Sequence, residues 1–179
     1  MESMTELLRH PLVQAAQSYA TRAHAETNHL YDGRPYASHL SMVVERAVEF
    51  LHLLDEADRP IALAGAWVHD TIEDARQTYN DVKKATNEAV AEVAFALTNE
   101  KGRTRKERAN ARYYEGIRAS DVATFVKICD RLANAGYSAA TRSRMLAVYR
   151  QEQPDFRAAL YSDRFAEMWD ALEQLLARA

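Results

Sequence analysis

The stretch PIALAGAWVHDTIED, residues 60–74, decides the fold of this chain. Residues 60–68 are apolar or small, and a helix built from them has no polar face to turn toward water. Asp58 can cap this helix and Pro60 can open it, because proline fits the first helical turn. We therefore expect a buried helix from Ile61 to about Asp70 at the centre of the protein.

Composition favours a single helical domain. The chain has 179 residues, of which 47% are hydrophobic, and this is enough for one well-buried core. Only five glycines and four prolines are present, so the turns that connect the strands of a sheet are scarce. We expect a compact all-α helical bundle that spans residues 1–179 as one domain.

Apolar and small residues recur at helical spacing on both sides of the central stretch. We expect helices over residues 11–26, from about 39 to 51, after an Asn87 cap to about 97, after a Ser120 cap to about 132, and from 145 to the end with a break at Pro154. Residues 28–35 contain Asn, Asp, Gly and Pro together and are expected to form a loop. Residues 99–112 are rich in lysine and arginine, which predicts a basic loop that runs into a helix.

Charge and cysteine content narrow the class of protein. The net charge is −3 and the isoelectric point about 6.1, without the basic excess of proteins that coat nucleic acid. The single cysteine, Cys129, cannot form an intrachain disulfide and is expected in the core. No signal peptide or membrane-spanning run is present. We expect a cytoplasmic protein with a small-molecule partner and neither nucleic acid nor membrane as partner; the oligomeric state stays open.

Four ionisable side chains follow within six residues at the exit of the central helix: His69, Asp70, Glu73 and Asp74. If the helix continues for one more turn, His69 and Glu73 share one face and the two aspartates share the adjacent face. This spacing predicts that His69 and Asp70 are metal ligands deep in a site. Glu73 and Asp74 would lie one turn further out, toward substrate and water.

Ligands from one turn cannot complete a coordination shell, so other helices must contribute. His39 stands at a predicted helix start, and Asp130 is embedded in an apolar helical pattern where an unpaired carboxylate is costly. Two imidazoles and two carboxylates suit Mn²⁺, Fe²⁺, Co²⁺ or Zn²⁺ better than Mg²⁺ or Ca²⁺. The alternative is a cluster of structural ion pairs that holds no metal.

Three motifs, in order, resemble those of HD-superfamily hydrolases of the RelA/SpoT-homologue type, in particular the small alarmone hydrolases. They are Tyr36-Ala-Ser-His39, His69-Asp70-Thr71-Ile72-Glu73-Asp74 and Lys127-Ile-Cys-Asp130-Arg131-Leu-Ala-Asn134. The similarity runs from about residue 16 to residue 149. It implies an all-helical HD-domain enzyme that uses Mn²⁺ to remove the 3′-pyrophosphate from ppGpp or pppGpp, leaving GDP or GTP and pyrophosphate.

The resemblance also implies a role for each matching residue. The implied metal ligands are His39, His69, Asp70 and Asp130. Glu73 and Asp74 become catalytic acids that position or deprotonate the attacking water. Tyr36 and Asn134 are implied to lie beside the nucleotide. The implied phosphate contacts are Lys101, Arg103, Arg105 and Lys106, although a solvated helix face also explains a run of this charge.

One stretch departs from the family pattern. Where many members carry an Arg-Lys pair against the guanine, this chain reads Leu30-Tyr31-Asp32-Gly33. Base recognition must therefore differ, and Tyr31 is expected to stack on a purine in place of the arginine. Guanine and adenine nucleotides both remain possible substrates.

Three hypotheses follow. The first is a Mn²⁺-dependent pyrophosphohydrolase of ppGpp-like nucleotides. The second keeps the metal chemistry but acts on another phosphorylated nucleotide, such as a nucleoside monophosphate, NADPH or an adenine alarmone. The third is a non-enzymatic helical binding module whose acidic cluster only stabilises the fold. Release of inorganic phosphate rather than pyrophosphate separates the nucleoside monophosphate and NADPH alternatives from the first hypothesis, and metal content separates both hypotheses from the third.

Overall fold

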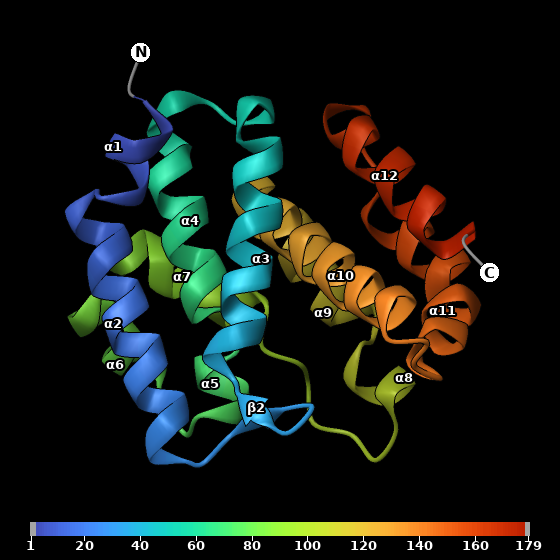
Figure 1. Ribbon diagram of the computed structural model, residues 1–179, viewed down its shortest axis with the longest axis horizontal. Coiled ribbons are helices and arrows are strands. Elements are labelled where there is room, and N and C mark those ends of the chain that lie inside the picture. The colour runs from blue at the N-terminus through green and yellow to red at the C-terminus, as the bar shows by residue number, and fades with distance from the viewer. Residues whose placement is uncertain (1–2, 178–179) are drawn as a thin grey trace.

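The computed structural model describes residues 3–177, which form an all-helical bundle with one short hairpin (Figure 1). The first half contains α1 Met4–Leu8, α2 Pro11–Glu26, α3 Ala37–Phe50, α4 Arg59–Val68, α5 Thr71–Asp74, α6 Tyr79–Ala85 and α7 Glu88–Ala96. The second half contains α8 Arg105–Arg108, α9 Ala111–Arg118, α10 Asp121–Ala140, α11 Met145–Leu160 and α12 Ala166–Ala177. The 3₁₀ turns are η1 Leu51–Leu53, η2 Glu56–Asp58 and η3 Asp163–Phe165. None of the helices within residues 3–177 could span a membrane.

The expected buried helix is α4, and it lies at the centre of the molecule. Every residue from Ala62 to Val68 is buried. Helix α4 packs against α2, α3, α7 and α10, so neighbours cover it on all sides. Its position brings the exit of the helix, with His69 and Asp70, into the interior of the bundle.

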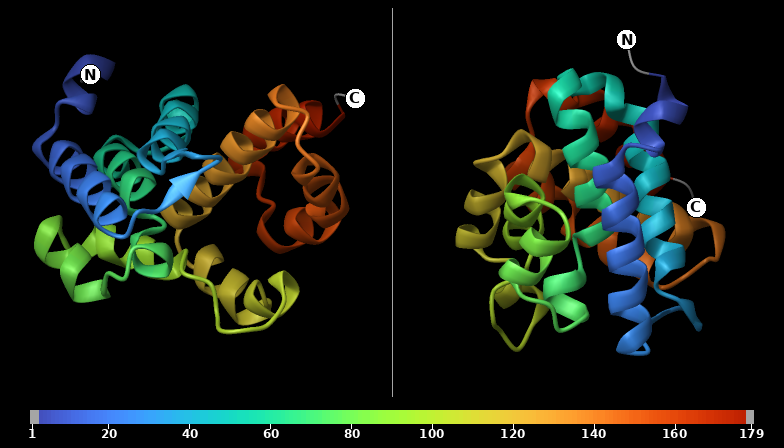
Figure 2. Two further views of the ribbon diagram at one scale, coloured as in Figure 1. Left: turned by 60° about the horizontal axis from the view of Figure 1, so that its bottom comes forward. Right: turned by 90° about the vertical axis from the view of Figure 1, so that its left-hand side faces the viewer.

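Helix α10 forms the second axis of the fold. It packs against α3 and α4 on one side and against α9, α11 and α12 on the other. Both Figure 1 and the left view of Figure 2 show α11 and α12 across α10 from α2. Ser120 caps α10 as expected, its Oγ accepting a hydrogen bond from the Ala123 N–H, and Cys129 lies in the core. Because α10 spans both halves of the bundle, Asp130 can face a site built largely from the first half.

Two expectations about secondary structure were wrong in detail. The helix that begins at Met145 continues through Pro154 to Leu160. A proline inside a helix removes one backbone hydrogen bond, but the buried Phe156 and Leu160 beyond it hold the last turns against the core. Residues 28–35 contain a hairpin, with β1 Leu30–Tyr31 antiparallel to β2 Arg34–Pro35. Asp32 and Gly33, with φ of 49° and 74°, make the tight turn.

Gly65 permits the close approach of α4 and α7. A Cβ atom built on Gly65 would lie 2.8 Å from Cγ1 of Val93. Valine is branched at Cβ and has few rotamers to escape into. Gly116, on α9, has no atom within 4 Å of the corresponding Cβ position. The two glycines therefore allow a tightly packed site to be compared with an open one by the same substitution.

We expect Gly65→Ala to lower the free energy of unfolding by about 1 to 2 kcal/mol, because overpacking outweighs the better helix propensity of alanine. The control Gly116→Ala should raise it by up to about 1 kcal/mol, since only the propensity changes. Urea unfolding of both variants measures the difference. Equal stability of the two variants would contradict the close packing of α4 and α7.

Candidate metal centre

Four predicted ligands meet where three helices converge. His39 lies in the first turn of α3, His69 and Asp70 lie in the turn between α4 and α5, and Asp130 lies midway along α10. The Nε2 atom of His39 is 3.2 Å from Oδ1 of Asp130 and 3.8 Å from Oδ2 of Asp70. The Nε2 atom of His69 is 2.9 Å from Oδ2 of Asp70 and 3.6 Å from Oδ1 of Asp130. All four side chains therefore point at one small volume.

The end of α4 sets the position of the His69 ring. The last carbonyls of a helix need partners outside it, and two side chains supply them here. Thr71 Oγ1 donates to the carbonyl of Val68 at 2.7 Å, and His69 Nδ1 lies 2.8 Å from the carbonyl of Ala66. The helix thus ends at Val68, earlier than expected. Because α5 starts afresh at Thr71, Glu73 and Asp74 do not continue the faces of α4.

The hydrogen-bond pattern leaves a lone pair facing negative charge. A carbonyl can only accept a hydrogen bond, so His69 Nδ1 carries a proton and Nε2 faces two carboxylates. In the neutral ring this Nε2 atom is a bare lone pair, and in the charged ring it is a donor. Nδ1 of His39 is buried without a hydrogen-bond partner among residues 3–177, and unprotonated Nε2 of His69 meets only carboxylate oxygens, which cannot donate to it. Such a cluster needs a positive charge at its centre, either an added proton or a cation.

The protonation energetics agree with that requirement. Burial lowers the pKa of His69, but the carboxylates of Asp70 and Asp130 outweigh it and raise the pKa well above its usual value. Burial raises the pKa of Asp130, but Lys127 and the two histidines outweigh it and hold that pKa well below its usual range. Imidazole nitrogens and carboxylate oxygens are a suitable donor set for a transition metal. His39, His69 and Asp70 each offer a ligand atom within 4.8 Å of the others, and these residues fit a metal ion.

Neighbouring side chains outside the four predicted ligands orient the carboxylates of Asp70 and Asp130. The hydroxyl of Tyr36 donates to Oδ2 of Asp70. The Tyr36 ring is itself stacked on His29, with ring centroids 3.9 Å apart. Asp130 accepts a hydrogen bond from Asn134 Nδ2 at 2.7 Å and pairs with Lys127 Nζ at 3.1 Å. Groups of this kind commonly hold metal ligands in the geometry that binding requires.

Tyr31 lies against His39, one of the predicted ligands. Its ring stacks on His39 with centroids 4.7 Å apart and an angle of 15° between the planes. Its hydroxyl donates to Oδ1 of Asn134 at 2.9 Å. Tyr31 is not among the residues that line the neighbouring cavity. One face of the ring we expected to stack on a purine is therefore covered by His39.

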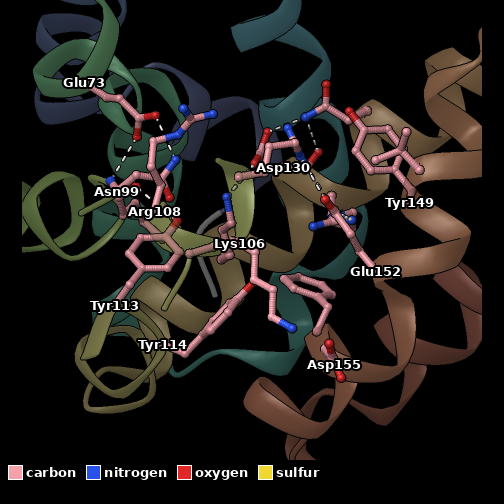
Figure 3. Close-up of a pocket in the computed structure, with 18 of the residues that line it drawn as sticks. Glu73, Asn99, Lys106, Arg108, Tyr113, Tyr114, Asp130, Tyr149, Glu152 and Asp155 are labelled. Carbon is pink, nitrogen blue, oxygen red and sulfur yellow. Dashed lines mark hydrogen bonds and ion pairs between the residues drawn. The ribbon is translucent and has the colours of Figure 1, made fainter. Parts of the chain in front are cut away.

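A cavity of about 710 Å³ opens beside the ligand cluster, a volume suited to a nucleotide-sized ligand (Figure 3). Tyr36, His39, Asp70, Asp130 and Asn134 form part of its wall. Figure 3 shows Glu73 and Asn99 on one side of the cavity and Tyr149 and Glu152 on the other. The cations in its wall are Arg105, Lys106, Arg108, Lys127 and Arg131.

The structure divides the expected phosphate contacts. Arg105 and Lys106 line the cavity, whereas Lys101 and Arg103 are exposed and do not line it. Sequence reasoning did not single out Arg108, Lys127 or Arg131 as contacts. A signal for two of them was present, because residues 127, 131 and 134 are spaced to lie on one face of α10 beside Asp130.

The two expected catalytic acids have different surroundings. Glu73 lines the cavity, and its oxygens accept hydrogen bonds from the Asn99 N–H at 3.0 Å and from Asn99 Nδ2 at 2.8 Å. Asp74 has no such donor among the described residues, and it is an exposed residue that does not line the cavity. Partial burial, together with the negative charges of Asp70 and Glu73, raises the pKa of Asp74 to about 7.

Comparisons with known proteins identify relatives. No family model matches the chain. It is 24% identical over 132 residues to guanosine-3′,5′-bis(diphosphate) 3′-pyrophosphohydrolase MESH1 of Danio rerio, a match that covers 74% of this chain and 69% of the relative. A solved structure, reported as a metazoan ortholog of SpoT that hydrolyzes ppGpp and plays a role in starvation responses, superposes with a TM-score of 0.71 at 20% identity. That superposition covers 92% of this chain and 93% of the other. The chain therefore shares the all-helical fold of this solved structure and is distantly similar in sequence to MESH1.

Proposed function

We propose that the chain is a divalent-metal-dependent phosphohydrolase that removes the 3′-pyrophosphate from ppGpp-like nucleotides, giving GDP or GTP and pyrophosphate. The observation that carries the proposal is the convergence of His39, His69, Asp70 and Asp130 at one wall of a cavity with cationic side chains. The similarity to MESH1 supports the substrate class. A purely structural ion-pair cluster would not need a nucleotide-sized cavity beside it.

The proposed cofactor is Mn²⁺, with Fe²⁺, Co²⁺ and Zn²⁺ compatible with the same mixed donor set. When bound, such a cation supplies a Lewis acid that offsets charge on a phosphoryl oxygen. His39, His69, Asp70 and Asp130 would hold it. The Tyr36 hydroxyl and the Asn134 amide keep the two carboxylates aimed at the same point.

The remaining groups handle the water and the phosphates. We keep Asp74 as the candidate proton acceptor, because a group whose pKa lies near 7 accepts and returns protons efficiently at neutral pH, although Asp74 itself does not line the cavity. Glu73 would orient the attacking water from the cavity wall. Arg105 and Lys106 would contact phosphate, and Arg108 adds a further positive charge to the same wall. Phosphate recognition is thus local, in a chain whose net charge is −3.

A second candidate is a phosphatase of another nucleotide. The contact of Tyr31 with His39 supports this second candidate. The Tyr31 ring is already stacked on His39 and so does not offer that face to a guanine base. Adenine alarmones, nucleoside monophosphates and NADPH are the compounds to compare. All would use the same ligand cluster.

We expect purified protein with Mn²⁺ to release pyrophosphate from ppGpp. Replacing one ligand, as in His69→Ala or Asp70→Asn, should lower kcat/KM by about a hundredfold or more, because charge stabilisation in the transition state is lost. His52→Ala is the control, since His52 pairs with Glu167 on the exposed surface. Product chromatography across these substrates decides the substrate class: faster turnover of an adenine alarmone, or release of inorganic phosphate from a nucleoside monophosphate or NADPH, would favour the second candidate. Full activity of His69→Ala would refute the site.

Metal binding should stabilise the fold, because the ligands come together only in the native state. A Mn²⁺ concentration about 100 times the Kd contributes about 2.7 kcal/mol, which corresponds to a rise in Tm of roughly 5–10 °C for a chain of this size. Differential scanning fluorimetry across a Mn²⁺ titration measures this rise. His39→Ala should abolish it and His52→Ala should retain it. A rise that is unchanged in His39→Ala would place the metal elsewhere.

Asp74 should make metal-free stability depend on pH. Its native pKa, about 7, lies above its ordinary value of 3.8, so the ionised form is disfavoured in the folded state. This destabilisation is absent below about pH 4 and fully present above pH 7. Asp74→Asn should therefore stabilise the protein at pH 8 more than at pH 5, as measured by urea unfolding with chelator present. An equal effect at both pH values would show that the carboxyl titrates normally.

A further inference from the structure

One acidic side chain in the cavity holds a position that a phosphate group would suit. Glu152, on α11, receives two hydrogen bonds from Arg105, at 2.8 Å from Nε and 3.2 Å from Nη2. It also accepts a hydrogen bond from Arg131 Nη1 at 2.9 Å. Both carboxylate oxygens thus face guanidinium groups from two different helices, α8 and α10.

The two arginines differ in how firmly they are held. Arg131 is a buried residue, 7% exposed, and its guanidinium lies over the rings of Tyr149, at 4.8 Å, and Phe156, at 4.4 Å. The Arg105 side chain is about half exposed, on a helix of only four residues. Arg131 is therefore a fixed donor, and Arg105 is a donor that can exchange its partner.

The charges of the cavity wall determine how much positive charge these two arginines can offer to a ligand. Its wall carries five cations, listed above, and five acids: Asp70, Glu73, Asp130, Glu152 and Asp155. The cations and acids cancel in formal charge, although the proposed substrate brings several negative charges. Asp70 and Asp130 face His39 and His69 in the predicted metal site. Glu152 is the acid that pairs directly with cations of the cavity wall, Arg105 and Arg131.

We propose that Arg105 and Arg131 form a phosphate subsite and that Glu152 fills this subsite in the free protein as an internal competitor. A phosphate group offers the same paired oxygens to a guanidinium and carries more charge than a carboxylate, so it can replace Glu152. The side chain of Glu152 is 29% exposed, so it can turn toward solvent when displaced. The inference rests on the proposed function for the kind of ligand, a phosphate-bearing nucleotide.

The experiment is calorimetric titration of the full chain with inorganic pyrophosphate in buffer without added metal. Glu152→Gln keeps an oxygen that can accept from Arg131 but removes the charge. Asp155→Asn is the matched control, because Asp155 lies one turn away on α11 in the same cavity wall and makes no ion pair or hydrogen bond within the described chain. Both variants remove one negative charge.

We expect Glu152→Gln to lower the Kd for pyrophosphate by about threefold to tenfold, and Asp155→Asn to lower it less than about twofold. The advantage of Glu152→Gln should fall to the level of Asp155→Asn when both are placed in an Arg105→Ala background. Equal effects of the two single variants would show that net charge alone acts, which overturns the proposal. Weaker binding by a folded Glu152→Gln protein would show that Glu152 supports the arginines, which also overturns it.

If Glu152→Gln unfolds, Glu152→Asp takes its place. It preserves the net charge but draws the carboxylate back by one methylene, so tighter pyrophosphate binding is expected again and unchanged binding overturns the proposal. Titration needs no turnover, so its outcome is separate from that of the proposed hydrolysis. Protein that hydrolyses ppGpp but shows no tightening would retain its function without this subsite.

Discussion

The site depends on one electrostatic requirement: acceptor groups from three helices face each other and need positive charge between them. The Ala66 carbonyl accepts a hydrogen bond from Nδ1 of His69, so the Nε2 atom that faces the Asp70 carboxylate at 2.9 Å must be met by a proton or a cation. Asp130 approaches the same point from α10. Removing such groups from water without a partner is costly, so the fold tolerates this arrangement when a cation or proton completes it.

The scaffold follows from this requirement. Helix α4 is buried on all sides, so its C-terminal end delivers His69 and Asp70 deep inside the bundle. The close contact between α4 and α7 at Gly65 fixes the position of α4. Helix α10 reaches from one half of the molecule to the other and presents Asp130 to the two histidines and Arg131 to the cavity. One helix thus connects the candidate metal site with the side chains proposed to bind phosphate.

The sequence predicted the helical class, the burial of α4 and the proximity of His39, His69, Asp70 and Asp130, because each rests on a strong local pattern or an ordered motif. Their role as metal ligands stays a prediction. The sequence was a weaker guide to features that depend on contacts between distant parts of the chain. The continuation of α11 through Pro154 depends on the buried Phe156 and Leu160. The engagement of Tyr31 by His39 depends on the hairpin turn. The pairing of Arg105 with Glu152 joins residues 47 positions apart, and composition carries no signal for it.

The most direct test is a crystal structure of the Mn²⁺-loaded protein with anomalous data collected at the manganese edge. The account predicts one anomalous peak bounded by Nε2 of His39, Nε2 of His69 and the carboxylates of Asp70 and Asp130. A cluster without a peak in protein saturated with Mn²⁺, or a single peak at a different group of side chains, would contradict it.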